Sequence, residues 1–431
     1  MLVTIIAIGS RGDIQPYLAL SKGLIDAGYA VRLATHAAFE TLVRNYALPF
    51  FPLDDDTQEF FQSERGRKAL EAGEIALLYV YRLARLTEPL VQRYMERCWE
   101  ACRDADLILV TFLSFLIGYS TAEKARKPLV ATFLQPSLLP TKFLPEPAMS
   151  HLPQWPPLIE NMFNYQSHII GGAVFWRLFT PAVNRARQNV YHLPPLPKKS
   201  LFASLPHAVD LILYAYSPLL VPKPADWDET TKVTGFWSLG PHAGWQPDPS
   251  LLEFLQSGPP PIYVGFGSMS AHRPDETVEL VAEALSLAEQ RGVIMIERAQ
   301  GSDQRRSDSL YVTKGLPHEW LFPHMQAIVH HGGAGTTAAS LRAGVPTIIV
   351  PHLADQQFWG ERMAKLGVGP KPVARCHLSA KKLAELLNIV GMNQEMQRRA
   401  QEVGAELRQE NGVEQAVKAI QACVAQKKKE H

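Results

Sequence analysis

The sequence predicts an α/β protein with two Rossmann-like domains in tandem, each a doubly wound parallel β-sheet covered by helices. Short runs of β-branched and aliphatic residues alternate with longer helical patterns, and the alternation starts again after residue 261. Strands that alternate with helices pair in parallel, because each helix carries the chain back to the same edge of the sheet. At about 150 residues per domain, the 431 residues suffice for two to three domains.

Five strands are expected in the first half of the chain, and the first of them leads into a helix between residues 16 and 27. All five are short and mostly apolar, which is typical of strands that are buried on both faces of a parallel sheet. The expected strands are Leu2–Ile8, Ala30–Thr35, Leu107–Thr111, Leu129–Phe133 and Leu211–Tyr214.

The second half repeats the pattern with five more short apolar runs. They are separated by helix-favouring stretches, so a second parallel sheet follows from the same reasoning. The expected strands are Ile262–Phe266, Val293–Glu297, Leu310–Val312, Ala327–Val329 and Thr347–Val350.

Proline density marks the region between the two sheets. Of the 33 prolines, 22 lie between Pro128 and Pro261, which indicates loops and irregular connections there. We therefore expect a first domain at 1–235, a linker at 236–261 and a second domain at 262–405. Residues 406–431 are predicted to form a solvated C-terminal helix with a basic tail.

Composition and charge exclude several classes of protein. Hydrophobic residues make up 46% of the chain and charged residues 20%, so the chain is globular rather than disordered. The 43 basic and 42 acidic side chains leave a net charge of +1, which argues against a nucleic-acid partner. The longest nearly apolar stretch, Leu107–Tyr119, is shorter than the roughly 18 residues that a membrane-spanning helix needs.

The N-terminus and the cysteines both favour a cytoplasmic protein. The apolar run Leu2–Ile8 has no basic flank and no small-residue cleavage site after it, so no secretory signal is expected. The four cysteines are too few and too scattered for a disulfide framework, which indicates a reducing compartment. A metal pair at Cys98 and Cys102 is a weaker interpretation than two buried small side chains.

A first candidate site follows the first expected strand, where Gly9–Pro16 reads GSRGDIQP. Two glycines allow a sharp turn from strand into helix and leave backbone N–H groups free to face an anion. Arg11 and Asp13 then lie at the mouth of the sheet, where ligands of such folds bind. A nicotinamide-dependent dehydrogenase is not favoured, because the motif is not GxGxxG and the second strand ends at His36 instead of an acidic residue.

A second candidate site lies in the second half. His330–Thr337 reads HHGGAGTT and connects an expected strand to a helix, and such a helix start offers the donors of a phosphate site. The next strand is followed by Asp355 and Gln356 at the same edge of the sheet. A carboxylate and an amide can bind vicinal hydroxyl groups, so sites for a phosphate and a sugar are expected side by side.

These motifs carry a resemblance to a known family. The run HHGGAGTTAASLRAGVPTIIVPHLADQQFWGERMAKLGVG at 330–369, with WLFP before it and GSRGDIQP near the N-terminus, resembles the GT-B glycosyltransferases of family 1. Within this family the chain is most similar to the sterol 3-beta-glucosyltransferases, and it also resembles the antibiotic glycosyltransferases. The resemblance implies an acceptor-binding domain at 1–235 and a nucleotide-sugar-binding domain at 262–405, facing a central cleft.

The resemblance also implies roles for individual residues. Asp13 lies where these branches carry the general base, and Asp355 and Gln356 match the pair that binds the hydroxyls of the sugar. Plant members have a tryptophan that stacks on uracil at the position of Gly315 here. The implied donor-binding residues are Ser10, Arg11, Gly12, Ser268, Leu316, His318, His331, Gly333, Ala334, Gly335, Thr336, Asp355 and Gln356.

The implied activity is that of a UDP-glycosyltransferase, specifically a hexosyltransferase. Glucose would move from UDP-glucose to a sterol-like lipophilic alcohol with inversion, giving a β-glucoside, and no metal or other cofactor is expected. The same chemistry on a macrolide, polyketide or other secondary metabolite is the nearest alternative. From other classes, a nucleotide-sugar epimerase would not need Asp13, and a non-catalytic GT-B accessory protein would not need both sites intact.

The acceptor site is expected in the aromatic, proline-rich stretch from Leu138 to Ala182, or else along Glu71–Tyr94. Such loops beside the first sheet can hold an apolar ligand, although aromatic residues at helical spacing also form cores. A lipophilic acceptor is compatible with a cytoplasmic protein that contacts the inner face of a membrane peripherally. The expected acceptor contacts are Phe143, Trp155, Phe163 and Trp176.

Overall fold

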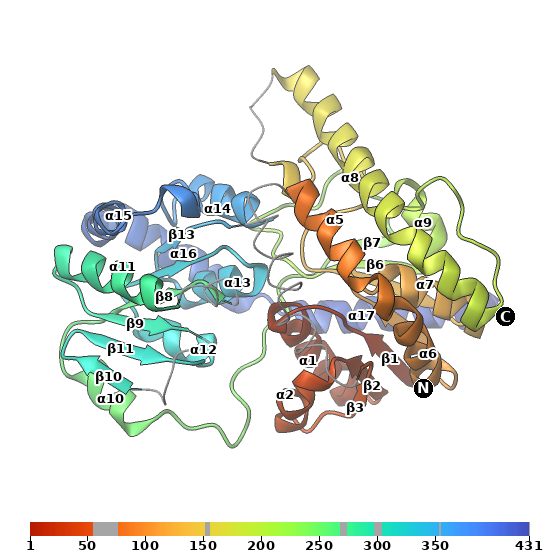
Figure 1. Ribbon diagram of the computed structural model, residues 1–431, viewed down its shortest axis with the longest axis horizontal. Coiled ribbons are helices and arrows are strands. Elements are labelled where there is room, and N and C mark those ends of the chain that lie inside the picture. Colours follow the sequence, from red (N-terminus) through yellow and green to blue (C-terminus); the bar gives the residue numbers. More distant parts are fainter. Residues whose placement is uncertain (55–75, 151–155, 268–273, 297–303, 353–354, 431) are drawn as a thin grey trace. The chain divides into compact units, whose positions relative to one another are not determined.

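The computed structural model describes all residues except 55–75, 151–155, 268–273, 297–303, 353–354 and 431. The chain forms two compact units (Figure 1). Unit 1 contains residues 1–238 and 411–431, and unit 2 contains residues 239–410. None of the described helices is both long and apolar enough to cross a membrane.

Unit 1 is built on a seven-stranded sheet in which every described pair of neighbouring strands is parallel. The strand order is β3-β2-β1-β4-β5-β6-β7. All five predicted strands are present, and the sequence analysis missed the two short edge strands β3 and β7. The strands are β1 Leu2–Ile6, β2 Ala30–Thr35, β3 Phe50–Pro52, β4 Leu107–Val110, β5 Leu129–Phe133, β6 Leu211–Tyr214 and β7 Thr231–Val233.

The inner strand β1 of unit 1 is largely buried, as a parallel strand between two layers of helices must be. Val3, Ile5 and Ile6 of β1 have no exposed surface. The helices are α1 Arg11–Asp26, α2 Glu40–Asn45, α5 Ala76–Thr87, α6 Val91–Cys102, α7 Phe115–Ala125, α8 Pro157–Ala186, α9 Leu205–Ala208 and α17 Gly412–Glu430. Shorter turns are η1 Ala37–Phe39, η2 Glu88–Leu90, η3 Pro147–Met149, η4 Arg187–Tyr191 and η5 Phe202–Ser204.

The C-terminal helix α17 differs from the predicted solvated helix, because it packs on α1 of unit 1. Gly23 of α1 allows this close approach, since a Cβ atom there would lie 2.3 Å from Cγ1 of Val413. Ala416 and Ile420 have no exposed surface, and Lys427 forms an ion pair of 2.8 Å with Asp210. The apolar stripe of α17 is thus part of the core, and only its other side is solvated.

Unit 2 contains a six-stranded sheet in the order β10-β11-β9-β8-β12-β13. Its described pairs are parallel except for the β10–β11 hairpin at the edge, whose polar strand β10 the sequence analysis missed. The strands are β8 Ile262–Gly265, β9 Gly292–Met295, β10 Gln304–Ser307, β11 Leu310–Thr313, β12 Ala327–His330 and β13 Thr347–Ile349.

Helices cover both faces of the second sheet and bury two apolar clusters. One cluster includes Val281 of α11 and Leu383 of α15, and the other includes Phe254 of α10 and Leu321 of α12. The helices of unit 2 are α10 Pro249–Gln256, α11 Pro274–Leu287, α12 His318–Leu321, α13 Ala334–Ala343, α14 Gln356–Lys365, α15 Ala380–Met392 and α16 Gln394–Gln409, with η7 Phe322–His324 and η8 Arg375–His377.

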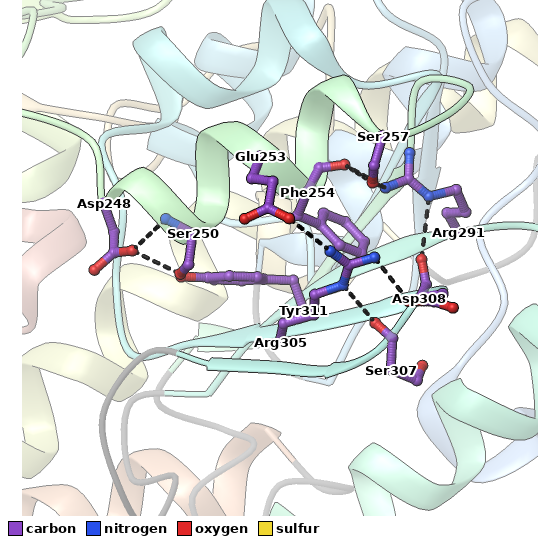
Figure 2. Close-up of polar contacts among 10 residues, drawn as sticks. All are labelled: Asp248, Ser250, Glu253, Phe254, Ser257, Arg291, Arg305, Ser307, Asp308 and Tyr311. Carbon is purple, nitrogen blue, oxygen red and sulfur yellow. Dashed lines mark hydrogen bonds and ion pairs between the residues drawn. The ribbon is translucent and has the colours of Figure 1, made fainter.

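Helix α10 falls within the stretch that was predicted as a linker, yet it is fastened to unit 2 (Figure 2). The Arg291 guanidinium donates to the Phe254 carbonyl at the end of α10 and to Oγ of Ser257, at 2.9 Å for the latter. The same guanidinium lies 4.3 Å from the centre of the Phe254 ring. Arg305 adds an ion pair of 3.5 Å with Glu253 of α10. These contacts make α10 a part of unit 2.

Candidate functional site

The first candidate site is the turn between β1 and α1. Gly9 has a φ of +143°, and a Cβ atom there would lie 2.6 Å from the Asp13 carboxylate, so this position requires glycine. Ser10 donates its backbone N–H and its hydroxyl to the same Asp13 oxygen, Oδ2, each at 2.8 Å. Asp13 is the third residue of α1, where the partial positive charge of the helix start stabilises a carboxylate.

Asp13 lines a small, largely apolar pocket at the carboxyl ends of the strands of unit 1. Burial raises the pKa of its carboxyl, and the hydrogen bonds from Ser10 lower it by a smaller amount. A raised pKa brings a carboxylate closer to the working range of a general base at neutral pH. The lining residues are Ile8, Asp13, Tyr17, Thr111, Phe112, Leu113, Leu134 and Gln135.

One residue near Asp13 was given no role in the sequence analysis. His36 follows β2 and accepts a hydrogen bond at Nε2 from the Gly9 N–H at 3.2 Å. Its other ring nitrogen, Nδ1, lies 2.5 Å from Asp54. Its position in the sequence could have indicated a role, because it directly follows β2. Strands β1 and β2 are parallel neighbours, so their carboxyl ends meet at one edge of the sheet.

The second candidate site is the turn between β12 and α13. Gly332 has a φ of +94°, and the glycine at position 333 precedes the helix and carries no capping side chain. The Thr337 N–H makes the first helical bond, to the Gly333 carbonyl at 2.9 Å. The N–H groups of Ala334, Gly335 and Thr336 therefore have no acceptor within the helix. A Cβ atom at Gly335 would meet no atom of the described residues within 4 Å, so the space beside this helix start is open among them.

One buried and two partly buried histidines lie near this turn and are neutral near pH 7. Burial lowers the pKa of His331 to about 4, and burial lowers the pKa of His352 to about 4 as well. The Gly332 N–H donates to Nδ1 of His330 at 3.0 Å, so neutral His330 carries its proton on Nε2. Within the described part of the chain, His330 Nε2 and the Thr337 hydroxyl are buried without a hydrogen-bond partner. Such unsatisfied donors beside a helix start favour a site for an anion.

The predicted pair after β13 lies beside this turn. A Cβ atom at Gly332 would come within 2.9 Å of the Gln356 carbonyl oxygen, which shows how closely the two turns approach. Gln356 accepts the His352 N–H at Oε1 at 2.7 Å, and Asp355 accepts the Trp359 indole N–H at Oδ2 at 2.8 Å. These bonds fix the orientation of both side chains next to the open end of α13.

The other predicted donor contacts are more scattered. Leu316 is 8% exposed and packs in the apolar core of unit 2, so its side chain is a core residue. His318 stacks on Phe322 with ring centres 4.4 Å apart and bonds the Tyr263 hydroxyl at 3.1 Å. Ser10, Arg11 and Gly12 are exposed in unit 1, at the start of α1, and Ser268 lies outside the described residues.

The four predicted acceptor contacts do not behave alike. Phe143 is 60% exposed and Phe163 is partly buried. Trp176, in contrast, is 4% exposed, donates its indole N–H to the Pro197 carbonyl at 3.1 Å and packs edge-on against Phe202. Its side chain is part of the core, where the sequence suggested an acceptor contact. Trp155 lies outside the described residues.

Comparison with known families gives two matches that flank the middle of the chain. Residues 3–137 match the glycosyltransferase family 28 N-terminal domain. Residues 280–423 match the C-terminal domain of the erythromycin biosynthesis protein CIII-like family. Both candidate turns lie within the matched ranges.

Curated relatives extend the similarity to almost the whole chain. UGT80B1 of Arabidopsis thaliana, a sterol 3-beta-glucosyltransferase, is 33% identical over 97% of this chain and 67% of its own length. A sterol 3-beta-glucosyltransferase of Neosartorya fischeri is 34% identical over 97% of this chain, which corresponds to 29% of that relative. The chain thus spans less than a third of the length of the fungal relative.

Solved structures share the fold. VinC, a glycosyltransferase solved in complex with dTDP, covers 99% of this chain and 100% of its own with a TM-score of 0.67 and 17% identity. SsfS6 of Streptomyces sp. SF2575, a glycosyltransferase solved in complex with thymidine diphosphate, covers 98% of this chain and 99% of its own, with a TM-score of 0.62 and 18% identity. These likenesses confirm the predicted architecture of two Rossmann-like domains.

Proposed function

The chain belongs to the glycosyltransferase family that contains the sterol 3-beta-glucosyltransferases, and from this premise we propose that it transfers glucose from UDP-glucose to the hydroxyl of a sterol-like alcohol. In this reaction the acceptor oxygen bonds to the anomeric carbon, and the bond from that carbon to the diphosphate oxygen breaks. UDP leaves with the electron pair of the broken bond. Attack from the side opposite the leaving group inverts the centre and gives a β-glucoside.

Asp13 is the proposed general base. The acceptor hydroxyl must lose its proton as it attacks, and a carboxylate within hydrogen-bond reach can accept it. Oδ2 of Asp13 is fixed by Ser10, and the carboxylate lines an apolar pocket. This placement of a carboxylate with a raised pKa in an apolar pocket is the observation that carries the proposal.

The turn before α13 is the proposed site of the diphosphate. Its N–H groups can stabilise the negative charge that grows on UDP as the glycosidic bond breaks. Thr336 adds a hydroxyl donor, and the neutral His331 ring, whose one N–H faces the Gly265 carbonyl, forms part of the same turn. Asp355 and Gln356, already oriented by Trp359 and His352, are proposed to bind the glucose hydroxyls.

A product assay tests the transfer itself. Purified protein is incubated with UDP-glucose and a panel of sterols, triterpenes and macrolides, and the products are identified by mass spectrometry. A mass gain of one hexose on a sterol, with a β-anomeric proton in the NMR spectrum, is expected. A gain on macrolides alone would move the substrate class to secondary metabolites, and the absence of any hexosylated product would contradict the transferase.

The proposed reaction needs no metal ion, because the helix start and its neighbouring N–H groups supply the positive charge. Turnover is therefore expected to persist in the presence of a chelator such as EDTA. The matched measurement adds excess magnesium after the chelator. Loss of turnover that magnesium restores would contradict metal independence.

We place the reaction in the cytoplasm, at a membrane surface that holds the lipophilic acceptor. All four cysteines are free thiols, as expected in a reducing compartment. Apolar side chains are exposed at Phe143 and at Met162 of α8, at 60% and 62%. Co-sedimentation with vesicles that contain sterol tests this proposal, and a protein that stays in the supernatant while it glucosylates free sterol would contradict it.

A further inference from the structure

A chain of hydrogen bonds runs through unit 1 and ends at the turn that carries Asp13. Asp54 is buried and accepts the Ala37 N–H at 3.0 Å and the Tyr94 hydroxyl at 3.4 Å. It also lies 2.5 Å from Nδ1 of His36, which is itself 4% exposed. The other side of the His36 ring receives the Gly9 N–H at 3.2 Å.

These contacts define the protonation of the His36 ring. Because Nε2 accepts the Gly9 N–H, that nitrogen carries no proton. Nδ1 must then carry the ring proton and donate it to Asp54. The Asp54 carboxylate therefore fixes both the tautomer and the orientation of the His36 imidazole. Carboxylates that hydrogen-bond a catalytic histidine in other enzymes do the same.

Gly9 is the position at which this chain of bonds can act on Asp13. Its φ of +143° is held in a region that only glycine adopts readily. Its neighbour Ser10 makes the two hydrogen bonds to the Asp13 carboxylate. A shift of the Gly9 peptide would carry Ser10 with it and release Asp13 from its fixed orientation.

We propose that His36 is a positioning residue for the transfer reaction, which holds the Gly9 peptide so that Asp13 faces the acceptor, with Asp54 orienting His36. The inference rests on the proposed function of Asp13 as general base. His36 touches neither substrate nor the reacting atoms, so its removal changes the rate through the geometry of Asp13. A displacement of about 1 Å can lower a rate by a factor of about 100.

Two variants separate the two hydrogen bonds of the ring. In His36→Gln, the side-chain amide reaches the place of Nε2 and can still accept the Gly9 N–H, but the bond to Asp54 is lost. In His36→Asn, the shorter amide takes the place of Nδ1 and can still donate to Asp54, but the bond to Gly9 is lost. We expect kcat to fall about 10- to 100-fold in His36→Asn and by less than about threefold in His36→Gln.

His168 supplies a matched control within unit 1. It is 1% exposed and lies 3.0 Å from the buried Glu146, so it is a second buried histidine–carboxylate pair. His168 makes none of the hydrogen bonds described at the Asp13 turn. His168→Gln is expected to lower the melting temperature and to keep kcat at saturating acceptor. A role of His36 in stability alone predicts equal losses of melting temperature in both His36 variants, with kcat unchanged.

The readouts are kcat, KM for UDP-glucose and amide hydrogen exchange in the peptide that covers residues 7–13. The proposal expects a lower kcat with an unchanged KM, and faster exchange, in His36→Asn relative to His36→Gln. Equal kcat values in the two variants, or a change confined to KM, would overturn it. The wild type could glucosylate no acceptor while hydrogen exchange in residues 7–13 is still faster in His36→Asn than in His36→Gln. That result would contradict the proposed function but support the role of His36 in holding the Gly9 peptide.

Discussion

The turn after β1 in unit 1 and the turn after β12 in unit 2 have similar backbone arrangements but differ in charge. In each, a glycine of positive φ follows a parallel strand, and a helix starts within a few residues. The first turn contains its own anion, because Asp13 accepts two bonds from Ser10. The second has Gly333 in place of Ser10 and the uncharged Thr336 in place of Asp13, and it retains donors without acceptors among the described residues.

This difference agrees with the two roles proposed for the turns in the transfer reaction. A helix start that already holds a carboxylate is a poor site for a phosphate, and the Asp13 carboxylate lines the pocket in which we propose that it acts as a base. A helix start without an internal anion can receive one from a ligand. On the proposed function, the side chain at the third helical position, Asp13 in α1 and Thr336 in α13, decides whether such a turn binds a proton or a diphosphate.

The largest expected effect comes from removing the internal anion. Asp13→Asn keeps the shape of the side chain but cannot accept a proton, so kcat should fall by about 10² to 10⁴ while UDP affinity is kept. Asp26→Asn, at the exposed other end of α1, is the control and should leave kcat unchanged. If a folded Asp13→Asn protein turns over within a few-fold of wild type, Asp13 is not the general base.

The second effect concerns the donors of unit 2. The His331→Ala, Thr336→Ala double variant removes the Thr336 hydroxyl donor and the ring that forms part of the turn, and UDP should bind about 10- to 100-fold more weakly by calorimetry. His324→Ala is the control, since His324 is exposed and lies before β12, at the opposite end of that strand. UDP affinity equal to that of wild type in the double variant would place the diphosphate elsewhere.

A smaller effect tests the acceptor side of the first turn. Phe143→Ala should raise the KM for the acceptor about tenfold without lowering the melting temperature, because the ring is exposed until a ligand covers it. Trp176→Ala should do the reverse, since it removes a core ring. Equal stability losses in both variants, with acceptor kinetics untouched, would direct the search for the acceptor site to other parts of unit 1.

The smallest effect is a difference in pH dependence between the turns. Burial lowers the pKa of His331 from 6.5 to about 4, so the unfolded chain binds this proton first as the pH falls. The free energy of unfolding should therefore decrease from about pH 6.5 down to about pH 4, and less steeply in His331→Gln. The raised pKa of Asp13 has the opposite sign, because its protonation on acidification relieves the cost of a buried charge. Parallel stability curves for wild type and His331→Gln would contradict the neutral buried imidazole.

Much of the fold could be predicted because the central strands are apolar runs next to glycine turns. The three strands that were missed, β3, β7 and β10, are three or four residues long at sheet edges, and β10 reads QRRS. Edge strands bury little surface, so their sequences carry little apolar pattern. Likewise, α10 could not be assigned to unit 2, because Arg291 reaches it from more than thirty residues away.

The two turns could be predicted as sites because glycine spacing and helix starts are local features. The role of His36 could not be predicted, because it depends on contacts with Asp54 and Gly9. Only the folded sheet brings these residues and Tyr94 together. Trp176 shows the converse limit. The sequence cannot distinguish an aromatic side chain that lines a pocket from one that packs in the core, as Trp176 packs against Phe202.

One substitution tests the contrast between the turns most directly, because it adds an acidic side chain to the first turn of α13, one residue before Thr336, the counterpart of Asp13. Gly335→Asp introduces a carboxylate at the start of α13, where a Cβ atom has free space. Gly335→Asn is its neutral match in shape. The account predicts that calorimetric UDP affinity is at least about tenfold weaker in Gly335→Asp than in Gly335→Asn, with a melting temperature at least as high. Equal UDP affinity in the two variants would contradict a diphosphate at this helix start.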